Sequence, residues 1–145
     1  MPVTDEQVAT LRAHLAGDVE EYQRRWGRLD RNAARTGYMA LLAAAFFEAV
    51  DRRFAQSGTA ADVIEFVGAL RARLDEDADE VDPVVAERLI RDALGDGSID
   101  DLDEDTIIST KVLLLTALIS DEKLGDAELD EFMATARSLG DRLMS

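Results

Sequence analysis

The residues with the greatest capacity for chemistry lie in one stretch, LGDGSIDDLDED (residues 94–105), which holds six acidic side chains. Carboxylates are preferred calcium ligands. A calcium loop supplies oxygens from positions 1, 3, 5 and 9, a glycine at position 6 and an acid at position 12. The competing hypothesis is an acidic turn that ends one helix and begins the next. The spacing of the acids decides between the two.

Aligned on its glycine, this region resembles an EF-hand loop over twelve residues. With Gly97 at position 6, four aspartates fall at positions 1, 5, 9 and 12: Asp92, Asp96, Asp100 and Asp103. Position 3 is Leu94, which has no side-chain ligand, and aspartate at position 12 reaches less far than glutamate. We therefore predict a helix that stops at Gly95, followed by a turn and by acids at the next helix N-terminus. Beyond weak, nonspecific binding of divalent ions, no metal site is predicted.

Four arginines form a second pattern, spaced four, three and four residues apart: Arg24, Arg28, Arg31 and Arg35. On a continuous helix they would share one face, which makes them a candidate interaction strip for phosphate or an acidic partner. The alternative is pairing at i,i+4 with two nearby glutamates, Glu20 with Arg24 and Glu21 with Arg25. The strip could also pair with the acidic part of this chain or of a second copy. We favour such pairing.

Groups suited to catalysis are scarce. The chain has no cysteine and one histidine, His14, which excludes thiol nucleophiles and histidine-rich metal sites. No GxSxG, GxxxxGK[ST] or GxGxxG motif occurs. Glu48 is the single acid in the most apolar segment and would mark a pocket if buried, although we expect it to pair with Arg52. We predict no catalytic residue and no cofactor.

Aromatic side chains give one further candidate for a binding site. Four of them could line a ligand cavity between helices: Trp26, Tyr38, Phe46 and Phe47. Aromatic residues at helical spacing more often fill the core, and core packing is the expectation for these four.

Composition and charge narrow the classes of function. The 145 residues, 47% of them hydrophobic, fit one domain, residues 1–145, with material for a core. Residues 1–58 have no net charge, whereas residues 59–145 carry the whole excess of −15. Such a field disfavours nucleic acid and anionic membranes as partners. A GC-rich genome and salt adaptation would both explain an acidic, lysine-poor chain. With no signal peptide or membrane span in the sequence, we expect a cytoplasmic protein.

Apolar periodicity predicts six helices and no strand. The first extends from Thr4 to Leu29, with Gly17 as a place where it could break; it would suit a dimer contact or fold back on the second helix. The helix at residues 38–54 is apolar nearly all round, so we expect it at the centre of the domain. The remaining helices are expected after Thr59, after Asp82, and over residues 104–119 and 126–143.

The C-terminal half contains a weak internal similarity. Residues 96–108 align without gaps on residues 121–133, sharing three aspartates. Residues 93–136 also resemble acidic helix–turn–helix repeats of the tellurite-resistance type, from which no function is carried over.

The sequence therefore predicts an all-α protein, a compact bundle of about six helices around a buried central helix. The function we favour is a non-enzymatic interaction or regulatory module that binds a protein partner, possibly itself as a homodimer. Two alternatives stay open: a domain that binds a small molecule or divalent metal, and an enzyme that uses carboxylates alone. The interaction hypothesis predicts an exposed apolar patch, and the other two predict a polar pocket or facing acids.

Overall fold

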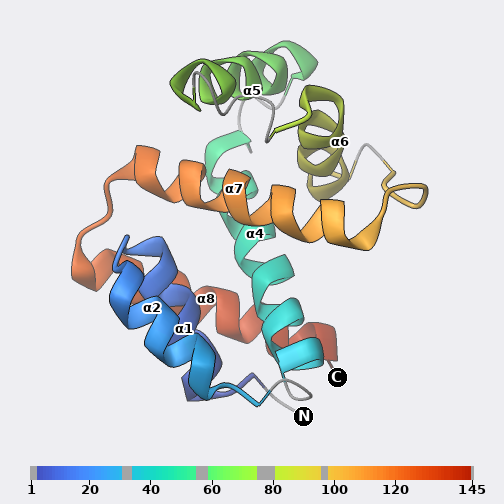
Figure 1. Ribbon diagram of the computed structural model, residues 1–145. Coiled ribbons are helices and arrows are strands. Elements are labelled where there is room, and N and C mark those ends of the chain that lie inside the picture. The colour runs from blue at the N-terminus through green and yellow to red at the C-terminus, as the bar shows by residue number, and fades with distance from the viewer. Residues whose placement is uncertain (1–2, 31–33, 55–58, 75–80, 96–97, 145) are drawn as a thin grey trace. The chain divides into compact units, whose positions relative to one another are not determined.

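The computed structural model describes residues 3–30, 34–54, 59–74, 81–95 and 98–144. Within these ranges the chain forms seven α-helices and one π-helix and contains no strand (Figure 1), which confirms the all-α prediction. In chain order the elements are α1 (Asp5–Leu15), α2 (Val19–Arg28), η1 (Ala34–Tyr38), α4 (Met39–Phe54), α5 (Ala60–Leu74), α6 (Pro83–Ala93), α7 (Glu104–Glu122) and α8 (Asp126–Met144).

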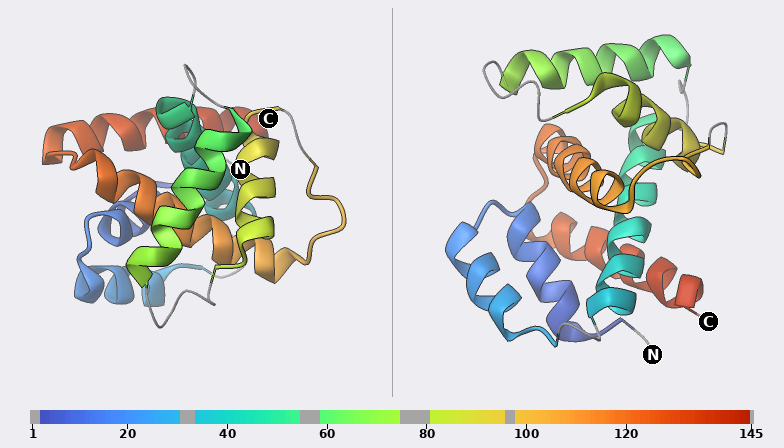
Figure 2. Two further views of the ribbon diagram at one scale, coloured as in Figure 1. Left: turned by 90° about the horizontal axis from the view of Figure 1, so that it is seen from above. Right: turned by 45° about the vertical axis from the view of Figure 1, so that its right-hand side comes forward.

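The predicted first helix is divided in two, which accounts for the seventh α-helix. Gly17 adopts φ +78°, a left-handed conformation that ends α1, and the Asp18 carboxylate then caps α2 by accepting from the Glu21 amide at 3.1 Å. α1 and α2 pack against each other as a hairpin (Figure 2), so the prediction of one unbroken helix from Thr4 to Leu29 was wrong.

The chain divides into two compact units. One contains Met1–Glu48 and Ile119–Ser145, and the other contains Ala49–Leu118. Both boundaries fall inside helices, α4 and α7. From the sequence, the first unit has 14 acids and nine bases, and the second has 17 acids and seven bases, giving net charges of −5 and −10. The prediction of a single domain stays a prediction.

In the first unit, the N-terminal segment is fastened to α8. Val3 is fully buried, and its amide donates to Asp141 Oδ1 at 2.7 Å. Arg137 donates to the Val3 carbonyl at 3.0 Å and pairs with Asp5. A Cβ at Gly140 would lie 3.1 Å from the Val3 side chain, so glycine permits this close approach.

The last turn of α1 also contacts α8, because Arg12 Nε donates a hydrogen bond to Asp130 Oδ1 at 2.6 Å. The buried face of α8 consists of apolar residues three or four positions apart, as expected for an amphipathic helix: Leu129, Phe132, Met133 and Ala136. Leu143, near the end of the helix, is exposed.

In the second unit, predicted caps begin both α5 and α6. Thr59 Oγ1 accepts from the Asp62 amide at 3.2 Å, and the Asp82 carboxylate accepts from Val84 and Val85 amides ahead of a helix that starts with Pro83. The two helices pack against each other, and each has a buried apolar face: Val63, Phe66, Val67 and Leu70 on α5, and Ala86, Leu89 and Ile90 on α6.

α4 is buried over much of its length, as its apolar sequence predicted. Its buried residues are Leu41, Leu42, Ala44, Ala45, Phe46, Ala49, Val50 and Phe54. Phe46 is buried as expected, but the expectation that Phe47 also packs in the core was wrong, because successive residues of a helix point in different directions and Phe47 is exposed. Glu48 is partly exposed on the same helix. Among the described residues, no helix has the length and apolar character needed to cross a membrane.

Candidate functional site

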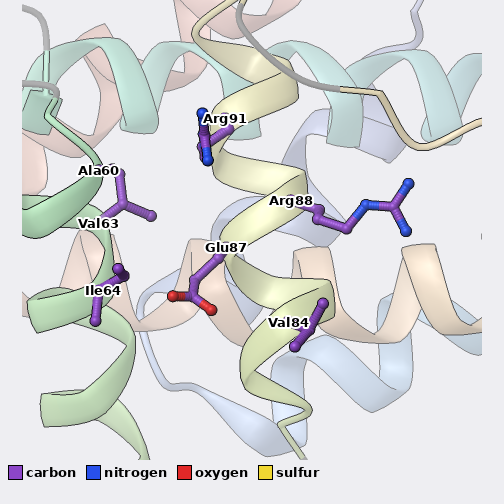
Figure 3. A pocket seen from close by; sticks show the side chains of 7 residues that line it. All are labelled: Ala60, Val63, Ile64, Val84, Glu87, Arg88 and Arg91. Carbon is purple, nitrogen blue, oxygen red and sulfur yellow. The ribbon is translucent and has the colours of Figure 1, made fainter.

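The candidate site is a shallow groove on the second unit, between α5 and α6 (Figure 3). Its volume is about 190 Å³. Three residues of α5 and four of α6 line it: Ala60, Val63 and Ile64, and Val84, Glu87, Arg88 and Arg91. A groove between two packed helices arises because their cylindrical surfaces diverge toward solvent, leaving a furrow that the outward side chains line.

Two large apolar side chains give this groove its character. Ile64 is 57% exposed and Val84 is 61% exposed, although both border the same hollow. Each lies outside the stripe of its own helix. Ile64 follows the buried Val63, and Val84 comes two residues before the buried Ala86. Packing of α5 on α6 therefore leaves both side chains in water, where a partner could cover them.

The charged side chains of α6 that line the groove extend in two directions relative to α5 (Figure 3). Glu87 and Arg91, one turn apart, extend on the side that faces α5, whereas Arg88 extends away from α5 (Figure 3). The aliphatic part of the Arg88 side chain therefore borders the groove, because its guanidinium binds Asp101 and the Ser98 carbonyl. Val84 extends on the same side of α6 as Arg88, so Glu87 and Arg91 lie between Val84 and α5 (Figure 3).

Arg88 binds the acidic turn that follows α6. Its guanidinium forms a bidentate pair with the Asp101 carboxylate and donates to the Ser98 carbonyl at 2.7 Å. The hydrogen bonds from Arg88 lower the pKa of Asp101, and the same hydrogen bonds raise the pKa of Arg88. The geometry is a planar fork on a carboxylate, which fixes the turn against the helix.

The acidic stretch is built as the predicted turn. α6 ends at Ala93, and Gly95 has φ +86°, the left-handed conformation expected at a helix stop. Asp103 Oδ2 accepts from the Thr106 amide at 3.2 Å, capping α7. Two of the acids therefore already have partners. Asp96 lies outside the described residues, and within these no group of three or more potential metal ligands is found.

Only part of the candidate arginine strip falls on one helix. Arg24 and Arg28 belong to α2, which ends at Arg28 because Leu29 is extended, with ψ 137°. Arg31 and the side chain of Arg35 lie outside the described residues. The predicted Glu21–Arg25 pair is present at 2.5 Å, but Arg24 pairs with Glu21 and not with Glu20. The strip as an interaction site stays a prediction.

His14 belongs to a chain of aromatic contacts in the first unit. Its ring lies 4.5 Å from that of Tyr22, Tyr22 lies 6.1 Å from Trp26, and Trp26 meets Tyr38 edge-on at 5.3 Å. Burial lowers the pKa of His14 and raises those of Tyr22 and Tyr38. These rings pack on one another. Tyr38 is buried, as expected for a core residue, whereas Trp26 is only partly buried, because α2 buries none of its side chains fully.

Two further titratable residues, Lys111 and Glu48, are not among those that line the groove. Lys111 on α7 is partly buried, and this burial lowers its pKa. The nearby Asp92 carboxylate opposes the shift but does not cancel it. The Glu48–Arg52 pair predicted from the sequence stays a prediction, as does a pocket near Glu48.

The groove was missed by the reasoning from sequence. Its signal was present in weak form, because Ile64 and Val84 are large apolar residues that fall off the stripes of their helices. That both border one hollow depends on how α5 packs on α6, which periodicity does not give.

Comparison with known proteins adds no assignment: no family model, no curated protein and no solved structure matches this chain.

Proposed function

We propose that this chain is a non-enzymatic interaction module that binds a helix of a partner protein in the groove between α5 and α6. The observation that carries the proposal is that Ile64 and Val84, both more than half exposed, line the same hollow between α5 and α6. Large apolar side chains gathered at a hollow commonly mark a surface that a partner covers. Covering them would return each side chain to an apolar environment.

The dimensions of the groove favour a helix over a small ligand. Pockets for drug-sized molecules measure roughly 300–1,000 Å³ and enclose most of the ligand. This groove is smaller, about 190 Å³, and side chains of two neighbouring helices line it. An amphipathic helix meets such a surface with side chains at i, i+3, i+4 and i+7, and its own backbone hydrogen bonds are already satisfied.

Its chemistry favours binding over catalysis. An enzyme that uses carboxylates alone needs two acids that face each other in a cleft, one of them with a raised pKa. On the α5 side of α6 the charged groups are instead an acid and a base, Glu87 and Arg91. The single histidine is stacked on Tyr22 in the other unit.

A peptide of neutral charge tests the groove itself. The probe is a designed helix of roughly 18 residues, with leucines spaced three and four apart and glutamines elsewhere. Its affinity is compared by fluorescence anisotropy for the parent chain, for a variant with Ile64→Gln and Val84→Gln, and for Val19→Gln. Val19 is a matched control because it is equally exposed, at 61%, on α2.

We expect the groove variant to bind the neutral peptide about tenfold or more weakly than the parent, because two buried side chains are lost from the contact. The control variant should bind as the parent does. Equal affinity for all three chains, or equal losses in both variants, would contradict the proposed function.

A further inference from the structure

We propose that α2 is a pH-sensitive helix, which stays docked on α1 and η1 while His14 is neutral and detaches when His14 gains a proton. The inference concerns the first unit and does not depend on the groove between α5 and α6. It rests on the shallow packing of α2, on the rings that attach this helix, and on the place of the histidine among them.

α2 packs shallowly on its neighbours. All ten of its residues remain at least partly exposed. Its ion pairs, from Glu21 to Arg24 and Arg25, lie within the helix itself. Tyr22 and Trp26, one turn apart on the same face, instead contact rings of other elements. An isolated helix shorter than about 12 residues is marginal in water, so α2 depends on this face to stay folded.

Ring contacts join α2 to the elements on either side of it in the chain. The ring of His14, on α1, lies 4.5 Å from that of Tyr22, and Trp26 meets Tyr38 of η1 edge-on at 5.3 Å. Tyr38 is buried, and Trp26 covers part of it. Detachment of α2 therefore exposes His14 to water and uncovers the Tyr38 ring.

His14 is the ring in this set that gains a charge near neutral pH. Burial lowers its pKa, whereas burial raises the pKa of Tyr22 and of Tyr38, which therefore stay neutral. Protonation places a charge among packed rings, and the cost is relieved when α2 leaves and water reaches the imidazole. Docking is therefore strongest above pH 6.5, the ordinary pKa of histidine, and weakens as the pH falls through the lower pKa of the docked state.

Charged groups on the neighbouring elements already have partners. Arg12 of α1 donates to Asp130 of α8 at 2.6 Å, and Asp18, which caps α2, accepts from the Glu21 amide at 3.1 Å. Glu21 also pairs with Arg25 at 2.5 Å. Carboxylates and arginines keep their charge between about pH 5 and pH 8, so a change in docking over this range is assigned to the histidine.

The single tryptophan of the chain reports the docking of α2. Trp26 fluorescence and the His14 ring resonance in NMR spectra are followed in the intact chain from about pH 8 to about pH 5. We expect the emission to move to longer wavelength as Trp26 enters water, with the same midpoint as the His14 titration and below 6.5.

Variants at the histidine separate its charge from its packing. His14→Phe keeps a ring against Tyr22 and cannot gain a proton, and His14→Gln is polar and cannot gain one either. Neither variant should show the fluorescence transition. Val19→Gln is the matched control, because it changes an exposed residue of α2 and leaves the histidine in place. It should keep the transition.

Hydrogen exchange distinguishes detachment of α2 from loosening of the whole unit. At about pH 5, amides of α2 should exchange about threefold or more faster in the parent than in His14→Phe at the same pH. Amides of α8, which belongs to the same unit, should exchange equally in the two chains.

Three results would overturn the proposal. A His14 midpoint at or above 6.5 would mean that the charged imidazole is stabilised on the Tyr22 ring, as in a cation–π contact. The same fluorescence transition in His14→Phe and His14→Gln would assign it to another group. Equal loss of protection in α2 and α8 would show that acid loosens the unit as a whole.

Discussion

Arg88 and Asp101 form a bidentate pair that joins α6 to the acidic turn after it, and the same arginine also donates to the Ser98 carbonyl at 2.7 Å. This pair has two consequences. It offsets one positive charge next to the groove, and it ties Ser98 and Asp101 of the acidic turn to α6. The predictions that follow begin with this pair.

Replacing Asp101 with asparagine should loosen the turn. The lowered pKa of Asp101 means that the folded state holds fewer protons than the unfolded state near the ordinary value of 3.8. The stability contributed by the pair is therefore full above about pH 4 and is lost as the pH falls through the lower, folded pKa. The free energies of unfolding of the parent and of Asp101→Asn, measured with urea, should differ at pH 6, and the difference should shrink as the pH falls below 3.8. A difference that persists below the folded pKa would contradict the role of the charge.

Calcium should not form a defined one-to-one complex with this chain. Asp101 is paired with Arg88, Asp103 caps α7, and Leu94 occupies a position where a calcium loop needs a ligand. Native mass spectra at low protein concentration should show no adduct, or a broad series of adducts from nonspecific binding. A single calcium per chain at micromolar ion would refute the turn as an ion-pair and capping structure.

Two glycines should respond in opposite directions to alanine. Gly17 has φ +78° between α1 and α2, so Gly17→Ala should lower the free energy of unfolding by about 1–2 kcal/mol. Gly27 lies within α2, and an added Cβ would meet nothing within 4 Å, so Gly27→Ala should raise it by up to about 1 kcal/mol. Denaturation by urea measures both. Losses of equal size in both variants would argue against the break at Gly17.

His14 is the one histidine in the sequence, so its titration can be followed without overlap from another imidazole. Burial against Tyr22 lowers the pKa of His14 below its ordinary value of 6.5. The unfolded chain then binds the proton more readily, so the free energy of unfolding falls as the pH drops from above 6.5 through the folded pKa. The His14 ring resonance in NMR spectra should titrate below 6.5, and the stability of His14→Gln should lose this pH dependence. A midpoint at or above 6.5 would contradict the half-buried position.

The sequence was sufficient for the helices and their ends because those features are local. Caps at Thr4, Thr59 and Asp82 and the stop at Gly95 depend on side chains within three or four residues. The break at Gly17 was recognised as possible but not chosen, because the apolar stripe continues on both sides of it. A stripe records which face is buried and not whether the helix is unbroken.

The candidate site, in contrast to the helix ends, could not be predicted from local sequence patterns. Ile64 and Val84 are twenty residues apart in the sequence, and only the packing of α5 on α6 brings both to the edge of one hollow. The orientation of Arg88 also depends on its pairing with Asp101, and the sequence does not show which of its 31 acidic residues would be that partner. Long-range packing and the choice of one ion pair among several are the steps that local patterns do not determine.

The most direct measurement of the central claim is a methyl NMR titration with isoleucine labelling, using the neutral peptide of leucines and glutamines. The δ1 methyl of Ile64 should shift saturably as the peptide is added, and that of Ile119, buried in the other unit, should not. Ile99 lies in the acidic turn, is not among the residues that line the groove, and reports binding of the peptide outside it. A shift at Ile64 that exceeds the shift at Ile99 is the result predicted for a docking groove. A shift at Ile99 with Ile64 unchanged would contradict it.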